Sequence, residues 1–119
     1  MIRNLAGIIA LLAFGALSGC ATMSGDECTT SDWVAVGYSD GARGYTADRL
    51  SNYNKACAKH GVTPNFRDYQ AGREEGLREF CQPSNGFTLG ERGGRYHGVC
   101  ATDLEPQFLD AYRVGSHLH

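Results

Sequence analysis

Two cysteine–histidine pairs have the spacing of zinc ligands. They are Cys57-x2-His60 and His97-x2-Cys100, and together they would supply the two thiolates and two imidazoles of a tetrahedral site. Thiolate ligands must stay reduced, whereas the cysteine count described below assigns these thiols to disulfides. His60 also stands late in an expected helix, where its ring interacts favourably with the helix dipole. The sequence therefore favours no metal site and no cofactor.

Four carboxylates form a second candidate set. Two of them could serve as the acid pair of a glycan hydrolase, whose two carboxyl groups must lie about 5 to 9 Å apart. The same residues also fit a solvated helix face, because Glu74 and Glu75 have arginine neighbours on the same helix. The chain carries no His-Glu-x-x-His, phosphate-loop or Cys-x-x-Cys motif, and its one Gly-x-Ser-x-Gly match, Gly37 to Gly41, falls within an expected helix and not at a strand-to-helix turn. We therefore expect no catalytic residue and favour a protein that is not an enzyme. The candidate carboxylates are Asp40, Glu74, Glu75 and Glu79.

Arginines and tyrosines make a third candidate, a patch that would face an anionic glycan or a lipid headgroup. The alternative is ordinary surface arginines beside half-buried tyrosines. The residues concerned are Arg43, Arg73, Arg92 and Arg95 with Tyr38, Tyr45 and Tyr96.

A cysteine near the N-terminus offers a different chemistry, lipid attachment. Arg3 is followed by an apolar run from Leu5 to Leu17 and then by Leu17-Ser18-Gly19-Cys20. This segment has the anatomy of a secretory signal and resembles a bacterial lipoprotein signal. The resemblance implies cleavage before Cys20, with acyl chains on its thiol and on the new amine. The alternative is an ordinary cleaved signal followed by a chance cysteine.

The apolar run is short for a membrane span. Its 13 residues reach roughly 20 Å as a helix, against a hydrocarbon core of about 30 Å. We therefore expect the membrane to be reached through lipid on Cys20. Ala21 follows the cysteine and resembles the residue pattern of lipoproteins sent to the outer membrane, which predicts a domain facing the periplasm.

The composition of the remaining 100 residues fits one small domain. They carry 10 basic and 13 acidic side chains, a formal charge of about −3, and no basic stripe that would indicate a nucleic-acid partner. Glycine is abundant, which raises the conformational entropy lost on folding. In an oxidising compartment, an even number of cysteines predicts disulfide bonds, which would offset this loss of entropy. With Cys20 lipidated, four are left for two disulfides: Cys28, Cys57, Cys81 and Cys100.

The chain predicts about four helices. Ala21 to Glu27 is small and polar and predicts a flexible spacer. Asp32 caps a first helix whose glycines share one face, and Thr46 caps a second that ends before Gly61. Thr63 and Pro64 begin a third helix, whose buried stripe is Phe66, Tyr69, Gly72, Gly76 and Phe80.

The rest of the chain is harder to assign. Gln82 to Gly86 is expected to stop the third helix, and residues 87–100 are expected to form an irregular connection with a short helical turn. A last helix is expected from about Pro106, closed by Gly115, with a frayed tail at residues 117–119.

One glycine pattern occurs twice. Gly37 and Gly41 are followed by Tyr45, and Gly72 and Gly76 by Phe80, each aromatic lying four residues after the second glycine. Since glycine weakens a helix interior by about 1 kcal/mol, such stripes make sense where another backbone approaches closely. The recurrence predicts either an internal duplication or two independent selections for close packing.

The expected helix order predicts the disulfide pairing. If the first two helices form an antiparallel hairpin, Cys57 returns to the end where Cys28 enters. The third helix then separates Cys57 from Cys81 by roughly 24 Å, far beyond the Cα separation that a disulfide tolerates. Cys28 with Cys81 has a similar mismatch if the three helices run up, down and up. We therefore predict Cys28 with Cys57 and Cys81 with Cys100, the second bond closing the glycine-rich segment.

Several of these motifs together resemble one family. The chain looks like the short bacterial lipoproteins grouped as domain of unknown function 2799, over nearly the whole mature sequence. The resemblance implies an envelope lipoprotein and supplies no activity, cofactor or catalytic residue. It rests on the Leu17 to Cys20 signal, Trp33 to Gly44 with its Gly-Tyr-Ser-Asp-Gly core, Tyr69 to Cys81 with Gly72 and Gly76, and Gly90-x3-Gly94-x-Tyr96-x-Gly98-Val99-Cys100.

The sequence thus predicts a mainly α-helical domain with a glycine-rich irregular segment, stapled by two disulfides. Residues 1–19 form the signal peptide, 20–30 the lipidated tether and 31–119 the helical domain. The expected function is a non-catalytic binding or structural accessory of the cell envelope. Its partners would be the membrane through Cys20 and an envelope protein, a glycan or a lipid headgroup, with no nucleic acid. The alternative is a hydrolase acting on cell-wall glycan or peptide.

Overall fold

A computed structural model describes residues 23–119, so the signal peptide and Cys20 lie outside the described residues. In this part of the chain there are six helices and no strand, in agreement with the mainly α-helical prediction. None of these helices is long and apolar enough to cross a membrane. The helices are α2 (Gly25–Thr30), α3 (Trp33–Ala42), α4 (Asp48–Ala58), α5 (Phe66–Phe80), α6 (Pro83–Glu91) and α7 (Glu105–Ser116).

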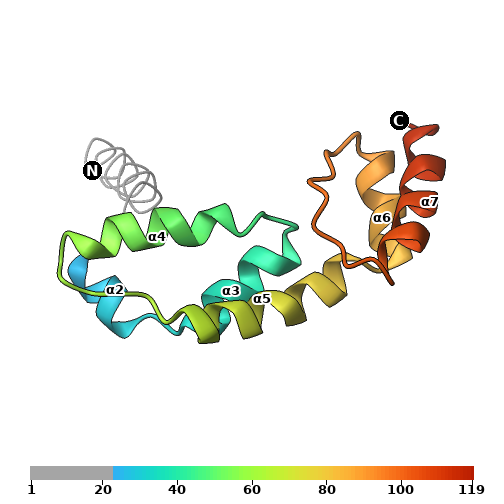
Figure 1. The fold of residues 1–119 in the computed structure, drawn as a ribbon. Coiled ribbons are helices and arrows are strands. Elements are labelled where there is room, and N and C mark those ends of the chain that lie inside the picture. The colour runs from blue at the N-terminus through green and yellow to red at the C-terminus, as the bar shows by residue number, and fades with distance from the viewer. Residues whose placement is uncertain (1–22) are drawn as a thin grey trace, which may run out of the picture.

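The helices form two units that follow one another along the chain (Figure 1). Unit one contains α2 to α5, and its core comprises Cys28, Trp33, Leu50, Cys57 and Tyr69. Unit two contains α6 and α7, and its core is formed by Phe80, Cys81, Cys100 and Phe108. Helix α5 runs directly from unit one into the core of unit two, because Phe80 is its last residue.

Glycines bring α3 and α5 together in unit one. A methyl group on Gly37 would lie 1.9 Å from the Tyr69 carbonyl oxygen, and one on Gly72 would lie 1.9 Å from that of Val34. Gly41 and Gly76 meet the facing backbone in the same way. Residue numbers rise together along the contact, so the two helices run parallel. The glycine face that the sequence predicts is therefore a backbone-to-backbone contact.

Unit two repeats this arrangement with α6 and α7. A methyl group on Gly90 would lie 2.2 Å from the Tyr112 carbonyl oxygen, and one on Gly115 would lie 2.1 Å from that of Phe87. Gly86 faces the Phe108 carbonyl, so this pair is parallel as well.

The two units therefore correspond residue by residue at several positions. Gly-Tyr-Ser-Asp-Gly-Ala-Arg-Gly at 37–44 matches Gly-Phe-Thr-Leu-Gly-Glu-Arg-Gly at 86–93. Both segments end in a glycine with positive φ, Gly44 and Gly93, and an aromatic ring covers each one, Phe80 on the first and His119 on the second. The repeat is thus 37–44 with 86–93. The two similar glycine motifs at 37–45 and 72–80 are not repeats of one another but the two sides of a single contact.

Parallel neighbours need a connection that carries the chain back. In unit one this connection is α4, which runs opposite to α3 and α5 (Figure 1). In unit two it is the shorter segment 92–104, which contains no helix. The expected antiparallel hairpin of α3 and α4 has the right chain direction, but the closest helix packing in unit one is between α3 and α5.

Both disulfides have the predicted pairing. Cys28 bonds to Cys57 with Cα atoms 5.6 Å apart, and Cys81 bonds to Cys100 with Cα atoms 5.7 Å apart. Each bond joins the segments that precede the two parallel helices of its unit. The disulfides therefore tie the helix pairs at their N-terminal ends.

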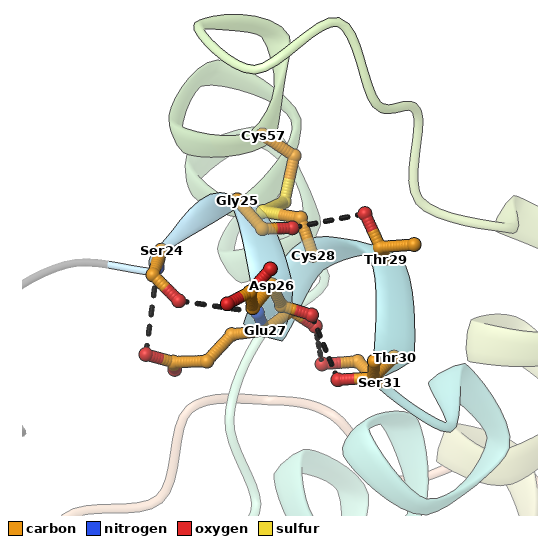
Figure 2. The surroundings of a disulfide bond; sticks show 9 residues. All are labelled: Ser24, Gly25, Asp26, Glu27, Cys28, Thr29, Thr30, Ser31 and Cys57. Carbon is orange, nitrogen blue, oxygen red and sulfur yellow. Dashed lines mark hydrogen bonds between the residues drawn. A yellow bond between two sulfur atoms is a disulfide. The ribbon is translucent and has the colours of Figure 1, made fainter.

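Two helices lie where none was expected. Helix α2 occupies part of the predicted spacer, because Ser24 and Glu27 form a capping box and Cys28 ties the turn to α4 (Figure 2). Helix α6 occupies Pro83–Glu91, in place of the expected stop and irregular connection. Pro83 stands at the start of this helix, where proline is favourable, and its glycines are required by the contact with α7.

Other boundaries differ by a few residues. Thr46 and Thr63 do not cap helices: α4 begins after Ala47 without a side-chain cap, and Asn65, a stronger capping residue than threonine, caps α5. Phe66 is 60% exposed, because it lies in the turn of α5 that precedes the contact with α3. Gly115 lies inside α7, and the tail expected to fray places the His119 ring on Gly93.

The α3–α5 contact generates a stability prediction. Gly72→Ala should lower the free energy of unfolding by about 1–3 kcal/mol or more, although alanine favours helix, because the methyl group overlaps the Val34 carbonyl. Gln70→Ala, on the exposed face of the same helix, is the control and should change it by less than about 0.5 kcal/mol. Thermal and urea unfolding of both variants measures the difference. Equal stability of the two variants would contradict the close approach.

Candidate functional site

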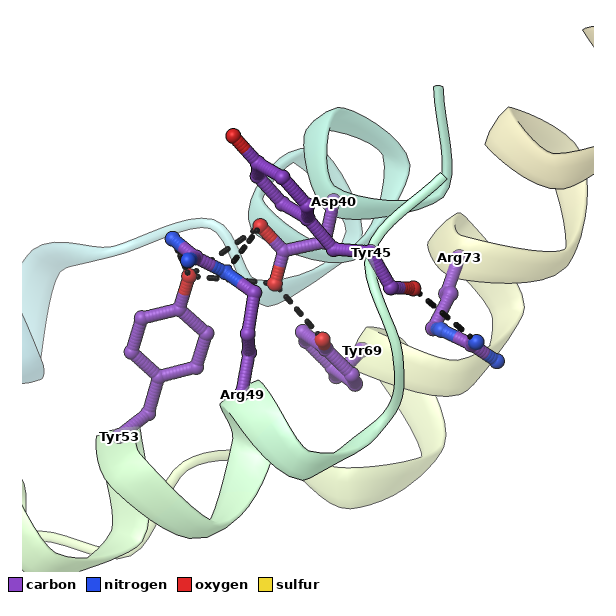
Figure 3. A network of polar contacts seen from close by, with 6 residues as sticks. All are labelled: Asp40, Tyr45, Arg49, Tyr53, Tyr69 and Arg73. Atoms are coloured by element: carbon purple, nitrogen blue, oxygen red, sulfur yellow. Dashed lines mark hydrogen bonds and ion pairs between the residues drawn. The ribbon is translucent and has the colours of Figure 1, made fainter. Parts of the chain in front are cut away.

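The most unusual group in unit one is a buried carboxylate. Asp40 lies on α3 between two glycines of the α5 contact and is 3% exposed. A buried charge is stable only when donors surround it. The Tyr69 hydroxyl donates to Asp40 Oδ2 at 2.7 Å, and the Tyr53 hydroxyl lies 3.1 Å from the same oxygen (Figure 3). Asp40 therefore joins α3 to α4 and α5.

An arginine completes the ring of donors. Arg49 Nε donates to Asp40 Oδ1 at 3.3 Å, and Arg49 Nη2 donates to the Tyr53 hydroxyl at 3.4 Å. The guanidinium carbon lies 4.4 Å from the centre of the Tyr45 ring, and both side chains are drawn in Figure 3. Stacking on an aromatic face and pairing with a carboxylate are both geometries that a guanidinium favours over an ammonium. The arginine is thus held in one orientation.

The surroundings fix the protonation of these groups. Burial and the Asp40 carboxylate raise the pKa of Tyr69, and they raise the pKa of Tyr53 against the opposing effect of Arg49. Burial lowers the pKa of Arg49, but its contacts with Tyr53 and Asp40 raise it more. Both tyrosines therefore remain hydrogen-bond donors at neutral pH, and the arginine remains charged.

A second arginine supports the loop that carries Tyr45. Arg73 Nη2 donates to the Tyr45 carbonyl at 3.2 Å, while its Nε is buried and has no hydrogen-bond partner. On the outer side of this loop, a pocket of about 200 Å³ is lined by Tyr45, Thr46, Arg49 and His97. His97 comes from unit two, so both units contribute to the pocket.

Several residues of the other candidate constellations have partners of their own in the structure. Cys57 and Cys100 belong to different disulfides, so their thiols are not free to serve the candidate zinc set that the sequence disfavours. Among the carboxylates, Asp40 is enclosed by donors, and Glu79 accepts a hydrogen bond from Tyr38. Of the arginine and tyrosine patch, Arg73 and Tyr45 come together, whereas the Tyr96 hydroxyl donates to Glu105.

Sequence reasoning missed three residues of the cluster: Arg49, Tyr53 and Tyr69 were not assigned to a polar site. A signal for them was present, because Asp40 lies on the glycine-lined face of an expected helix. A carboxylate in that position must be buried and therefore needs donors from the neighbouring elements.

The network predicts how substitutions at Asp40 and Tyr69 affect stability, and unit two indicates which apolar residues can replace them. Asp40→Leu should lower the free energy of unfolding by about 1–3 kcal/mol, because it leaves the buried Tyr69 hydroxyl without a partner. Adding Tyr69→Phe should restore much of this loss, since Leu89 and Phe108 occupy the matching positions of unit two. A double-mutant cycle from urea unfolding measures the coupling between the two sites.

The control is Asp110→Leu, which removes a carboxylate that is 78% exposed in an ion pair with Arg113. Its effect should stay within about 0.5 kcal/mol. Strictly additive losses for Asp40→Leu and Tyr69→Phe would contradict the coupling.

Comparisons with known proteins place the chain in a family. The model of the family described as protein of unknown function (DUF2799) matches residues 32–117, which span α3 to α7 and both parallel helix pairs. No curated protein and no solved structure matches the chain. Since the match covers more than half of the sequence, this chain belongs to the DUF2799 family, a family of unknown function.

Proposed function

We propose that this chain is a cell-envelope lipoprotein whose helical domain is a non-catalytic binding or structural accessory facing the periplasm. The anchor in this proposal is lipid on Cys20, and the membrane is the outer membrane, as Ala21 indicates. The observation that carries the proposal is the pairing of all four remaining cysteines in two disulfides. Such bonds persist in oxidising compartments, where a lipoprotein signal would deliver the domain.

The length of the tether supports a domain held close to the bilayer. Ser24 caps α2 and lies four residues after Cys20, a distance of at most about 14 Å for an extended chain. The Cys28–Cys57 bond then fixes α2 to the end of α4. In the proposed arrangement, this end of unit one lies next to the lipid headgroups, and unit two lies farther from them.

The contacts of the carboxylates support a binding role over the hydrolase. A general acid or base must reach its substrate, but Asp40 is buried and its oxygens accept from two tyrosines and an arginine. Glu79 is occupied by Tyr38. The network orients donors and restrains helices, which suits recognition or scaffolding.

Lipid attachment predicts the behaviour of a Cys20→Ser variant. Two or more acyl chains anchor a protein stably, so the variant should be lost from the membrane fraction or remain unprocessed. Ser18→Ala, which keeps a small residue before the cysteine, is the control and should stay in the membrane. Fractionation and mass spectrometry of the mature N-terminus measure both. An unmodified Cys20 in mature protein extracted from membranes would contradict the anchor.

The non-catalytic role predicts the outcome of a cell-wall assay. The purified chain, incubated with isolated peptidoglycan, should release no soluble fragments above a boiled control. Release that disappears in Glu74→Gln or Glu75→Gln, but persists in the exposed variant Asp110→Asn, would instead favour the hydrolase. Chromatography and mass spectrometry of the supernatant distinguish cleavage of glycan from cleavage of peptide.

A further inference from the structure

The two units provide an internal comparison of what the helix pair requires. Leu89 and Phe108 in unit two occupy the positions of Asp40 and Tyr69 in unit one. Gly86, Gly90 and Gly115 of unit two repeat the backbone contacts of Gly37, Gly41 and Gly76, and Ala111 stands in place of Gly72. The packing therefore forms with an apolar pair at these positions, and the buried carboxylate is not needed for it. Because burying a charge is costly, Asp40 calls for a role beyond packing.

The contacts of Asp40 indicate this role, because the carboxylate holds the side chain of Arg49. Arg49 is carried by α4, the connection whose counterpart in unit two contains no helix. Its contacts with Asp40 and Tyr53 use two of the five N–H donors of a guanidinium. The side chain remains 42% exposed. The carboxylate thus fixes one edge of the guanidinium and leaves other donors facing solvent.

Arg49 also lines a pocket together with Tyr45, Thr46 and His97. A threonine hydroxyl, a guanidinium and an imidazole can all donate hydrogen bonds, and no acidic residue belongs to the lining. Helix α4 begins at this point without a side-chain cap, and Asp48 is the acidic residue of its first turn; this exposed carboxylate is outside the lining of the pocket. The volume of about 200 Å³ is below the range of whole drug-sized ligands, and it suits a single acidic group.

We propose that this pocket binds an oxyanion, the carboxylate or phosphate end of an envelope ligand, with Arg49 as the binding residue and Asp40 as its positioning residue. The ligand is recognised by hydrogen bonds from the Arg49 fork, the Thr46 hydroxyl and the His97 ring. This inference deepens the proposed binding role, and its test is independent of lipid on Cys20. If the pocket binds no anion, the proposal of lipid on Cys20 is unaffected. If Cys20 carries no lipid, the proposal of anion binding is likewise unaffected.

The experiment is a side-chain NMR titration of the complete chain in non-ionic detergent, with sodium acetate and inorganic phosphate as separate probes. Sodium chloride at equal ionic strength is the reference. The Arg49 Nε–H signal and the backbone amide signals of Thr46 and His97 should shift saturably with acetate or phosphate and not with chloride. The two amide signals also report binding in the variant that lacks Arg49. Saturation by acetate alone assigns a carboxylate ligand, and saturation by phosphate alone assigns a phosphate ligand. Saturation by both supports the shared oxyanion chemistry.

Three variants make the result specific. Arg49→Lys should bind at least about tenfold more weakly, because an ammonium cannot offer the planar fork. Arg113→Lys, an exposed arginine paired with Asp110, should bind as the wild type does. Asp40→Leu with Tyr69→Phe copies unit two and should stay folded by circular dichroism, yet bind about tenfold more weakly.

Equal affinity of Arg49→Lys and Arg113→Lys, or shifts no larger than those with chloride, would overturn the site. Full affinity in the Asp40→Leu, Tyr69→Phe variant would overturn the positioning role of Asp40. Should that variant unfold, Arg49→Lys still decides whether the pocket binds the anion.

Discussion

The approach of two helix backbones at glycine is the contact on which the rest of this structure depends. Since Gly37 and Gly72 each leave no room for a methyl group, α3 and α5 lie closer together than side chains would allow. The same contact joins α6 and α7 through Gly90 and Gly115. Parallel pairing requires a return connection in each unit, and the disulfides close each unit where its two helices begin. The backbone contact, the return connection and the disulfide therefore form one structural motif, which occurs in both units.

The two units solve the same burial problem with different chemistry. Unit one places a carboxylate and a tyrosine hydroxyl at the helix contact, where they bond at 2.7 Å. Unit two places Leu89 and Phe108 there. Replacing both partners of a buried hydrogen bond by apolar groups is often nearly neutral, whereas replacing one is not. The polar pair of unit one therefore differs from the apolar pair of unit two mainly in what it holds, because only Asp40 has an arginine, Arg49 of α4, beside it.

Local signals in the sequence predicted much of the fold. Asp32 caps α3 as expected, and chain direction was enough to predict both disulfides. Helix α6 was missed because Pro83 and two glycines indicate a loop when no partner helix is considered, and only the packing of α7 explains them. The site was harder, since Arg49 and Tyr69 are ordinary helix residues until α4 and α5 bring them to Asp40.

The position of the disulfides also sets the covalent topology of the chain. A single peptide bond broken between Cys28 and Cys57, or between Cys81 and Cys100, leaves the two fragments joined through sulfur. No disulfide spans the backbone between Cys57 and Cys81, most of which is α5, or the backbone after Cys100, which includes α7. Proteases cut exposed, flexible segments in preference to packed helices. In each unit, therefore, the second helix of the parallel pair is held in place by its backbone contact with the first helix and not by a disulfide.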